Sequence, residues 1–127
     1  MGRIAAKYGA AYASKEQIKY TFPTPDQVKK ISPNGIGMPT KRAMAIALLA
    51  QAVLNNSVKL SSHIAPNVLA SELKAIPGIG PWTSNYVLMR GLASTDIFMA
   101  SDLAVRRVVK KLYQIDSVIA SLSLIHI

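Results

Sequence analysis

One carboxylate and two aromatic side chains are the residues of this sequence that could do chemistry together. Trp82 and Tyr86 are four residues apart, so a helix would place them on one face. Aromatic faces attract electron-poor or cationic rings, and the carboxylate of Asp102 could stabilise positive charge that develops in a reaction. The simpler interpretation is that both aromatic residues belong to the core and that Ser101 or Asp102 caps a helix.

Two glycines and two prolines interrupt the helical pattern just before Trp82, in the stretch LKAIPGIGPWTSNYVLMRGL. The pattern predicts a helix–hairpin–helix over residues 67–91. We expect Gly78 and Gly80 to adopt backbone angles that are closed to other residues and to let another backbone approach. Pro81 suits the first turn of the second helix, whose free N–H groups and positive dipole end would hold a phosphate. The alternative is a plain helix–turn–helix corner.

Charge and composition narrow the class of partner. The 127 residues are enough for one domain, and 15 Lys and Arg against 6 Asp and Glu give a net charge of +9. This balance favours nucleic acid first and an anionic membrane surface second. The chain has no Cys, which excludes disulfides, a Cys-ligated zinc and an iron–sulfur cluster.

Membrane insertion and secretion are not expected. The longest apolar run, residues 43–54, is too short to span a bilayer and is typical of a helix that is buried on most sides. The N-terminus lacks the hydrophobic region of a signal peptide. We therefore expect a soluble intracellular protein.

Helix signals recur along the chain, and strand-like alternation is nowhere sustained, which predicts an all-α fold. Thr24 and Pro25 mark the start of one helix, and Pro39 and Thr40 mark the start of the long apolar one. The expected helices cover residues 3–12 with Gly9 as a stop, a stretch that starts at residue 25, residues 40–54, residues 66 or 67 to 76, residues 81–90, and a helix that Ser101 or Asp102 caps and that runs to residue 113.

Four stretches together resemble a known family. They are FPTPDQVKK, GMPTKRAMAIALLAQAV, LKAIPGIGPWTSNYVLMRG and DIFMASDLAVRR. They are similar to the helix–hairpin–helix/Gly-Pro-Asp superfamily of DNA glycosylases, and within it to the 3-methyladenine DNA glycosylase II branch. The resemblance covers roughly residues 5–113. It implies hydrolysis of the N-glycosidic bond of alkylated bases in double-stranded DNA, after the base has been flipped out, in base excision repair.

The resemblance implies a role for individual residues. Asp102 matches the catalytic aspartate, and Trp82 and Tyr86 would form the base pocket. Trp82 also stands where the bifunctional members carry a nucleophilic lysine, which implies a monofunctional hydrolase. The residues that would hold a DNA phosphate are Gly78, Ile79, Gly80, Pro81 and Thr83. No cofactor and no side-chain metal site are expected, although Na+ or K+ could bind the backbone carbonyls of Lys74, Ile76 and Ile79.

Other charged residues keep two interpretations. Asp96 is a rival to Asp102 for the catalytic role, or else a solvated loop residue. Arg90 could pair with either carboxylate. The remaining cations could contact phosphate or form solvated faces; they are Lys41, Arg42, Arg106, Arg107, Lys110 and Lys111.

The ends of the chain depart from the family pattern. Family members have more chain on both sides, so we expect a partial glycosylase domain over residues 1–120, truncated at both ends. Residues 121–127 continue no family pattern and resemble translated adapter sequence. Leu103 stands where the family has an aromatic residue, which would remove one pocket contact.

Two functional classes therefore remain. One is a monomeric monofunctional alkylbase glycosylase, located in the bacterial cytoplasm or nucleoid, or in the nucleus if the source is eukaryotic. The other is a non-catalytic helix–hairpin–helix DNA-binding module or an inactive glycosylase fragment. Asp102 distinguishes them, because a binding module gains nothing from a carboxylate near phosphates.

Overall fold

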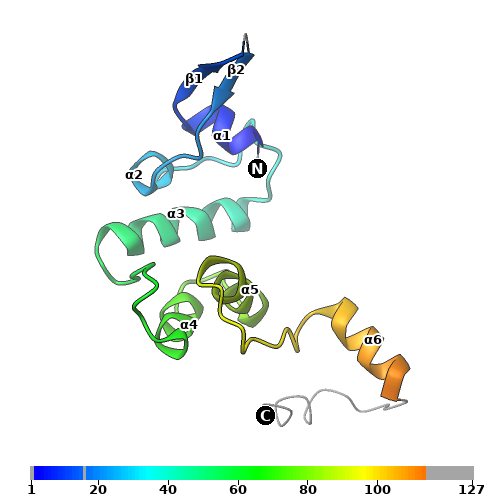
Figure 1. The fold of residues 1–127 in the computed structure, drawn as a ribbon. Coiled ribbons are helices and arrows are strands. Elements are labelled where there is room, and N and C mark those ends of the chain that lie inside the picture. The colour runs from blue at the N-terminus through cyan, green and yellow to red at the C-terminus, as the bar shows by residue number, and fades with distance from the viewer. Residues whose placement is uncertain (1, 16, 114–127) are drawn as a thin grey trace.

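The computed structural model describes residues 2–15 and 17–113, which form a chain of helices with one small β-hairpin (Figure 1). The elements of this part are α1 (Gly2–Tyr8), β1 (Ala11–Ser14), β2 (Gln17–Tyr20), α2 (Pro25–Val28), α3 (Thr40–Leu54), α4 (Pro66–Lys74), α5 (Pro81–Gly91) and α6 (Leu103–Tyr113). In Figure 1, α3 crosses the middle, with the β-hairpin, α1 and α2 on one side and α4 and α5 on the other. The sequence tail 121–127 lies outside the described residues.

The central helix α3 is shared by two hydrophobic clusters. The first packs α1, α2 and the loop before α3 against it, through the buried residues Ile4, Val28, Ile31, Ile36, Ala43 and Ala50. The second packs α4 and α5 against it, through the buried residues Val58, Leu69, Leu73, Ile76 and Leu88. An apolar helix with small residues on two sides suits this central position, although Met44 and Leu54 remain exposed.

The start and end of the long helices follow from local sequence. Pro39 and Thr40 begin α3, and Asn55 ends it with an amide that donates to the Gln51 carbonyl. The predicted start at Pro25 is confirmed, but α2 is only one turn long. At that start the Thr24 amide donates to the side-chain oxygen of Gln27 at 2.8 Å, which satisfies a group that the helix leaves unpaired.

The first helix and the β-hairpin differ from the sequence-based prediction. The helix expected over residues 3–12 ends at Tyr8, and β1 pairs antiparallel with β2, with Ala11 opposite Tyr20. The strands are four residues long and almost entirely exposed. β1 does not alternate between apolar and polar residues, and β2 (QIKY) alternates over four residues only, which is too short for a sustained strand pattern. Gly9 is the stop: a side chain there would meet the Thr21 carbonyl.

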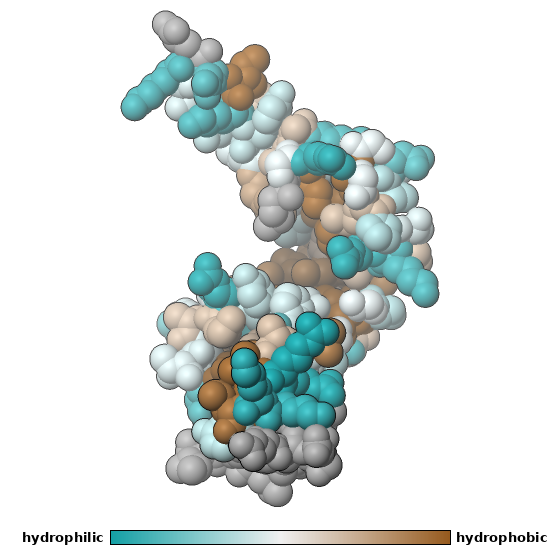
Figure 2. Space-filling view, turned by 90° about the vertical axis from the view of Figure 1, so that its right-hand side faces the viewer, coloured by the Kyte–Doolittle hydropathy of each residue, from teal (hydrophilic) through white to brown (hydrophobic). Residues whose placement is uncertain are grey.

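The last described helix, α6, stands apart from the two clusters. It buries no side chain, and Leu103, Val108 and Leu112 are between 55% and 71% exposed. Figure 2 shows its apolar residues beside a hydrophilic band. Among the helices of the described residues, none is both long and apolar enough to cross a bilayer.

Candidate active site

The hairpin between α4 and α5 is built around one glycine with unusual backbone angles. Gly78 has a φ of +91°, in the region that favours glycine, and a Cβ there would lie 3.0 Å from the Cβ of Ala45 on α3. The Ile79 amide donates to the Ile76 carbonyl at 3.0 Å and closes the turn. Gly78 therefore lets the turn bend and also lets α3 lie close to it.

Gly80 has a different role from the predicted one. Its φ of −95° and ψ of −179° describe extended backbone that any residue adopts, so the expectation of restricted angles is wrong at this position. A Cβ on Gly80 would meet nothing within 4 Å. What the missing side chain provides is open space in front of the first turn of α5.

The N-terminus of α5 carries the predicted phosphate-binding residues. Gly80 is the N-cap and offers no side chain, and Pro81 occupies the first turn without an N–H. The first hydrogen bond between turns of α5 runs from the Ser84 amide to the Gly80 carbonyl. The amides of Trp82 and Thr83 come before it, so the helix itself supplies no acceptor for them. Thr83 and Ile79 line a groove of about 490 Å³ together with Gly78. The phosphate itself stays a prediction.

Lys41 and Arg42 lie on the opposite wall of this groove. Both come from the first turn of α3 and line the groove with Met38, Ala45, Ile46 and Leu49. In the sequence these two cations lie 37 and 36 residues before Gly78, and the sequence alone leaves their position open. The close contact between α3 and Gly78 brings them to the same surface.

Trp82 and Tyr86 face each other on the first two turns of α5. Their ring centroids are 5.2 Å apart and the rings are inclined by 13°, which is a stacked pair. Each side chain is 43% exposed. The expectation that the two residues share one face is confirmed, and the alternative that they are ordinary core residues does not fit their exposure.

Asp102 joins this pair by a hydrogen bond across 20 residues of sequence. The indole Nε1–H of Trp82 donates to Oδ2 of Asp102 at 2.6 Å. The other oxygen, Oδ1, accepts the amides of Ala104 at 2.8 Å and Val105 at 3.2 Å, at the start of α6. Asp102, not Ser101, is thus the helix cap, and the same carboxylate orients the tryptophan.

These donors keep the carboxylate ionised. The Trp82 N–H, and after it the amides of Val105 and Ala104, hold the pKa of Asp102 below its ordinary value. An ionised carboxylate beside a half-exposed aromatic stack can bind a planar cationic ring on the stack and stabilise positive charge next to it.

The other predicted charged residues lie elsewhere. Arg90 makes no ion pair with Asp96 or Asp102 in the part of the chain that the structure describes, where the ion pair present is Lys29–Asp26. For Asp102, which is bonded to Trp82, the reason is distance along α5: Arg90 lies eight residues after Trp82, or about 12 Å along the axis. Asp96 is exposed in the loop before α6, and Leu103 is 64% exposed.

The basic residues of α6 form one side of that helix. Arg107, Lys110 and Lys111 are exposed and Arg106 is partly buried. Asp102 accepts the Arg106 backbone amide with its own carbonyl at 2.9 Å, so this basic face begins one turn after the candidate catalytic carboxylate.

Known proteins similar to this chain are DNA repair enzymes. A probable bifunctional transcriptional activator/DNA repair enzyme AlkA of Mycobacterium tuberculosis is 35% identical over 112 residues, which are 87% of this chain and 23% of that protein. DNA-3-methyladenine glycosylase 2 of Escherichia coli is 34% identical over 108 residues, which are 83% of this chain and 38% of that protein. No family model matches.

Solved structures with this fold are glycosylases as well. A 3-methyladenine DNA glycosylase from Archaeoglobus fulgidus superposes with a TM-score of 0.71 at 25% identity and covers 96% of this chain. An 8-oxoguanine glycosylase/lyase of Clostridium acetobutylicum in complex with double-stranded DNA superposes with a TM-score of 0.80 at 22% identity and covers 98%. The fold is that of the helix–hairpin–helix DNA glycosylases, and the sequence is similar to part of the AlkA and DNA-3-methyladenine glycosylase 2 proteins.

The chain spans less than half the length of each of these four proteins. It covers 23% and 38% of the two relatives and 42% and 43% of the two solved structures. Within this span the glycosylase fold brings Trp82, Tyr86 and Asp102 together. The hydrogen bond between Trp82 and Asp102 was missed from the sequence, where only the types of the two residues were informative.

Proposed function

We propose that this chain is the hairpin-bearing part of a monofunctional DNA glycosylase that hydrolyses the N-glycosidic bond of alkylated bases of the 3-methyladenine type. The observation that carries the proposal is the hydrogen bond to Asp102 from Trp82, in the first turn of α5 directly after the hairpin turn. This bond places the aromatic surface that would bind a cationic base next to the carboxylate that would stabilise positive charge on the sugar. The similarity to 3-methyladenine glycosylases supports the same substrate class.

The chemistry follows from these side chains. Alkylation gives a purine a positive charge, and the flipped base would stack on the exposed aromatic pair through cation–π attraction. When the bond between C1′ and the base nitrogen breaks, its electron pair leaves with the base and positive charge builds on the sugar. The ionised Asp102 stabilises that charge, and water adds to C1′ and gives up one proton.

The absence of an amine at position 82 supports a hydrolase without a lyase step. A lyase needs a nucleophilic amine that forms a Schiff base with the sugar, and Trp82 has none. We expect borohydride to trap no covalent adduct between the protein and DNA that carries an alkylated base. A trapped adduct would assign the reaction to another amine and overturn the monofunctional assignment.

The partner in this proposal is double-stranded DNA. Phosphates would bind the amides at the start of α5 and the cations Lys41 and Arg42 across the groove. The proposal includes a monovalent cation bound to the backbone carbonyl oxygens of Lys74, Ile76 and Ile79. Carbonyl oxygens suit such an ion, and the Ile76 oxygen, which accepts the Ile79 amide in the turn, has a second lone pair for it. The protein would act as a monomer wherever the cell keeps its DNA.

A second candidate is a DNA-binding module without catalysis. Both oxygens of Asp102 already have partners, Trp82 on one side and the α6 amides on the other. A structural role would therefore account for the residue.

Release of alkylated bases from duplex DNA decides between the two candidates. The assay compares the chain as given, a version extended at both ends, and Asp102→Asn in each. Release by the parent and its collapse in Asp102→Asn support the glycosylase, whereas DNA binding without release by the extended protein supports the binding module.

A further inference from the structure

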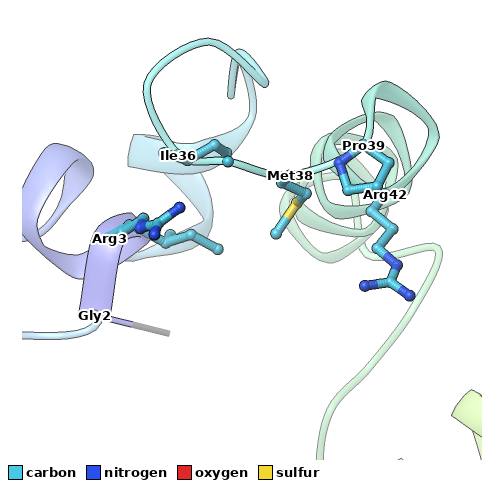
Figure 3. Close-up of a pocket in the computed structure, with 8 residues that line it drawn as sticks. Gly2, Arg3, Ile36, Met38, Pro39 and Arg42 are labelled. Atoms are coloured by element: carbon cyan, nitrogen blue, oxygen red, sulfur yellow. The ribbon is translucent and has the colours of Figure 1, made fainter.

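A second pocket adjoins the groove at the first turn of α3 and is lined by two arginines from distant parts of the chain. It measures about 420 Å³ and is lined by the N-terminal turn of α1, the loop before α3, and Pro39 and Arg42 at the start of α3. Figure 3 shows Arg3 and Arg42 on opposite sides, with Ile36 and Met38 between them. The walls are therefore apolar and the rim is doubly cationic.

The loop is shaped to admit the Arg3 side chain. Gly37 has a φ of +62°, and a Cβ there would lie 2.1 Å from Nη1 of Arg3. The guanidinium thus occupies the space that a side chain at this position would need. Lys7, one turn further along α1, donates to the Asn34 carbonyl and is used within the fold.

The two guanidinium groups have no carboxylate to balance them. Across residues 2–15 and 17–113 the one ion pair is Lys29–Asp26, so neither Arg3 nor Arg42 is neutralised by an acidic side chain there. Guanidinium groups present rigid forks of donors that match phosphate oxygens. Two such groups on the rim of one pocket suit a doubly contacted anion.

The pocket continues the hairpin surface. Met38 and Arg42 line both this pocket and the groove that reaches Gly78, Ile79 and Thr83. We propose that Arg3 extends the phosphate contact of Arg42, so that this pocket holds the DNA backbone next to the hairpin groove. The inference rests on the DNA-binding part of the proposed function, and it assigns a role to α1, which lies farthest from the aromatic stack along the described chain.

Salt dependence of DNA affinity tests the contact. Each phosphate that a protein neutralises contributes about 0.9 to the slope of log affinity against log salt concentration. We expect Arg3→Gln and Arg42→Gln each to lower the slope for an unmodified duplex by about one, and the double variant by about two. Arg90→Gln is the matched control, because it removes the same charge from an exposed site in the last turn of α5.

A variant that keeps the net charge separates position from bulk charge. Gly37→Ala would displace the Arg3 guanidinium, and its slope should fall towards that of Arg3→Gln. Circular dichroism reports whether this variant folds; if it does not, the three arginine variants decide the question on their own.

Several outcomes would overturn the inference. One is an unchanged slope in the double variant while Gly80→Val still weakens binding, which leaves the hairpin as a DNA contact and removes the pocket. Another is an equal loss in Arg90→Gln, which assigns the effect to overall charge. Calorimetric binding of inorganic phosphate with unchanged DNA slopes would assign a free-anion site instead.

Failure of the proposed function gives a different result. The salt-dependence measurements do not require base release. A protein that binds DNA and releases no base therefore refutes the glycosylase assignment, and the salt slopes of the arginine variants still test the DNA contact at the pocket. A parent protein that binds no DNA at all refutes both.

Discussion

Asp102 uses its two oxygens for three hydrogen bonds, which an asparagine cannot reproduce. The single carbonyl oxygen of Asn can keep the α6 amides or the Trp82 N–H, and its NH2 group would then face a donor. We expect Asp102→Asn to abolish base release in the extended protein and to lower the free energy of unfolding. Base-release kinetics on alkylated duplex DNA and urea unfolding measure the two effects.

The control for this substitution is Trp82→Phe. It removes the N–H and keeps an aromatic face beside Tyr86, so it separates the effect of the hydrogen bond from the effect of the negative charge.

DNA affinity should hold or improve in Asp102→Asn, because a carboxylate near phosphates is repelled by them. Full base release by Asp102→Asn would transfer the catalytic role to Asp96 or leave the DNA-binding module as the function.

The indole hydrogen bond also makes a pH-dependent contribution to stability. Because the folded-state pKa of Asp102 lies below its ordinary value of 3.8, the unfolded chain binds the proton first as the pH falls. The contribution is therefore complete above the ordinary pKa and is lost as the pH falls through the folded-state pKa. We expect the free energy of unfolding of the parent to exceed that of Trp82→Phe at neutral pH, with the gap narrowing below pH 3.8.

Urea unfolding of both proteins between neutral pH and the acid limit of folding measures that gap. The other carboxylates titrate in both proteins and cancel in the difference. A gap that stays constant through the acid range would mean that the indole N–H does not act on the charged form of Asp102.

At the scale of elements, the hairpin turn contains two glycines that should respond in opposite ways. Gly78→Ala places a side chain at a φ of +91° and 3.0 Å from the Cβ of Ala45, so we expect a loss of about 1–2 kcal/mol of stability. Gly80→Ala meets neither obstacle and should leave stability unchanged or raise it by about 0.4–1 kcal/mol. The same Cβ would stand in front of the α5 amides and weaken DNA binding.

Urea unfolding and DNA affinity of the two variants form a matched pair. Gly78→Ala should lower the free energy of unfolding at least as much as it weakens the free energy of DNA binding. Gly80→Ala should weaken DNA binding without lowering the free energy of unfolding. If Gly80→Ala bound DNA as the parent does, the first turn of α5 would not be a phosphate site.

The elements show which features the sequence could predict. Proline and threonine at helix starts placed α3 and α5, and the spacing of Trp82 and Tyr86 placed them on one face, because these signals are local. The β-hairpin was missed because its strands are four residues long, so the alternation in QIKY is not sustained long enough to indicate a strand. The bond between Trp82 and Asp102 and the placing of Arg3 and Arg42 around one pocket depend on how distant segments pack, and no local pattern contains that information.

At the scale of the whole molecule, the buried contacts that hold the helices together are unevenly distributed. α3 is covered by both hydrophobic clusters, and α4 and α5 are joined through the fully buried Leu69, Leu73 and Leu88. Ser84, also fully buried, lets the two helices approach and donates from Oγ to the Ala70 carbonyl at 3.4 Å. In contrast, α6 buries no side chain and is tied to the rest by the bond between Asp102 and Trp82.

This distribution predicts different rates of amide hydrogen exchange along the chain. Amides of a helix without buried apolar contacts exchange through local opening, whereas those of a packed helix exchange only when a larger part of the protein unfolds. We therefore expect α6 amides to exchange much faster than those of α4 and α5, and to exchange faster still in Trp82→Phe, which removes the indole donor to Asp102. Exchange measured by mass spectrometry at two protein concentrations checks both expectations. Protection of α6 equal to that of α4 at high concentration and lost on dilution would show that a second copy covers its apolar face, and would contradict the expected monomer.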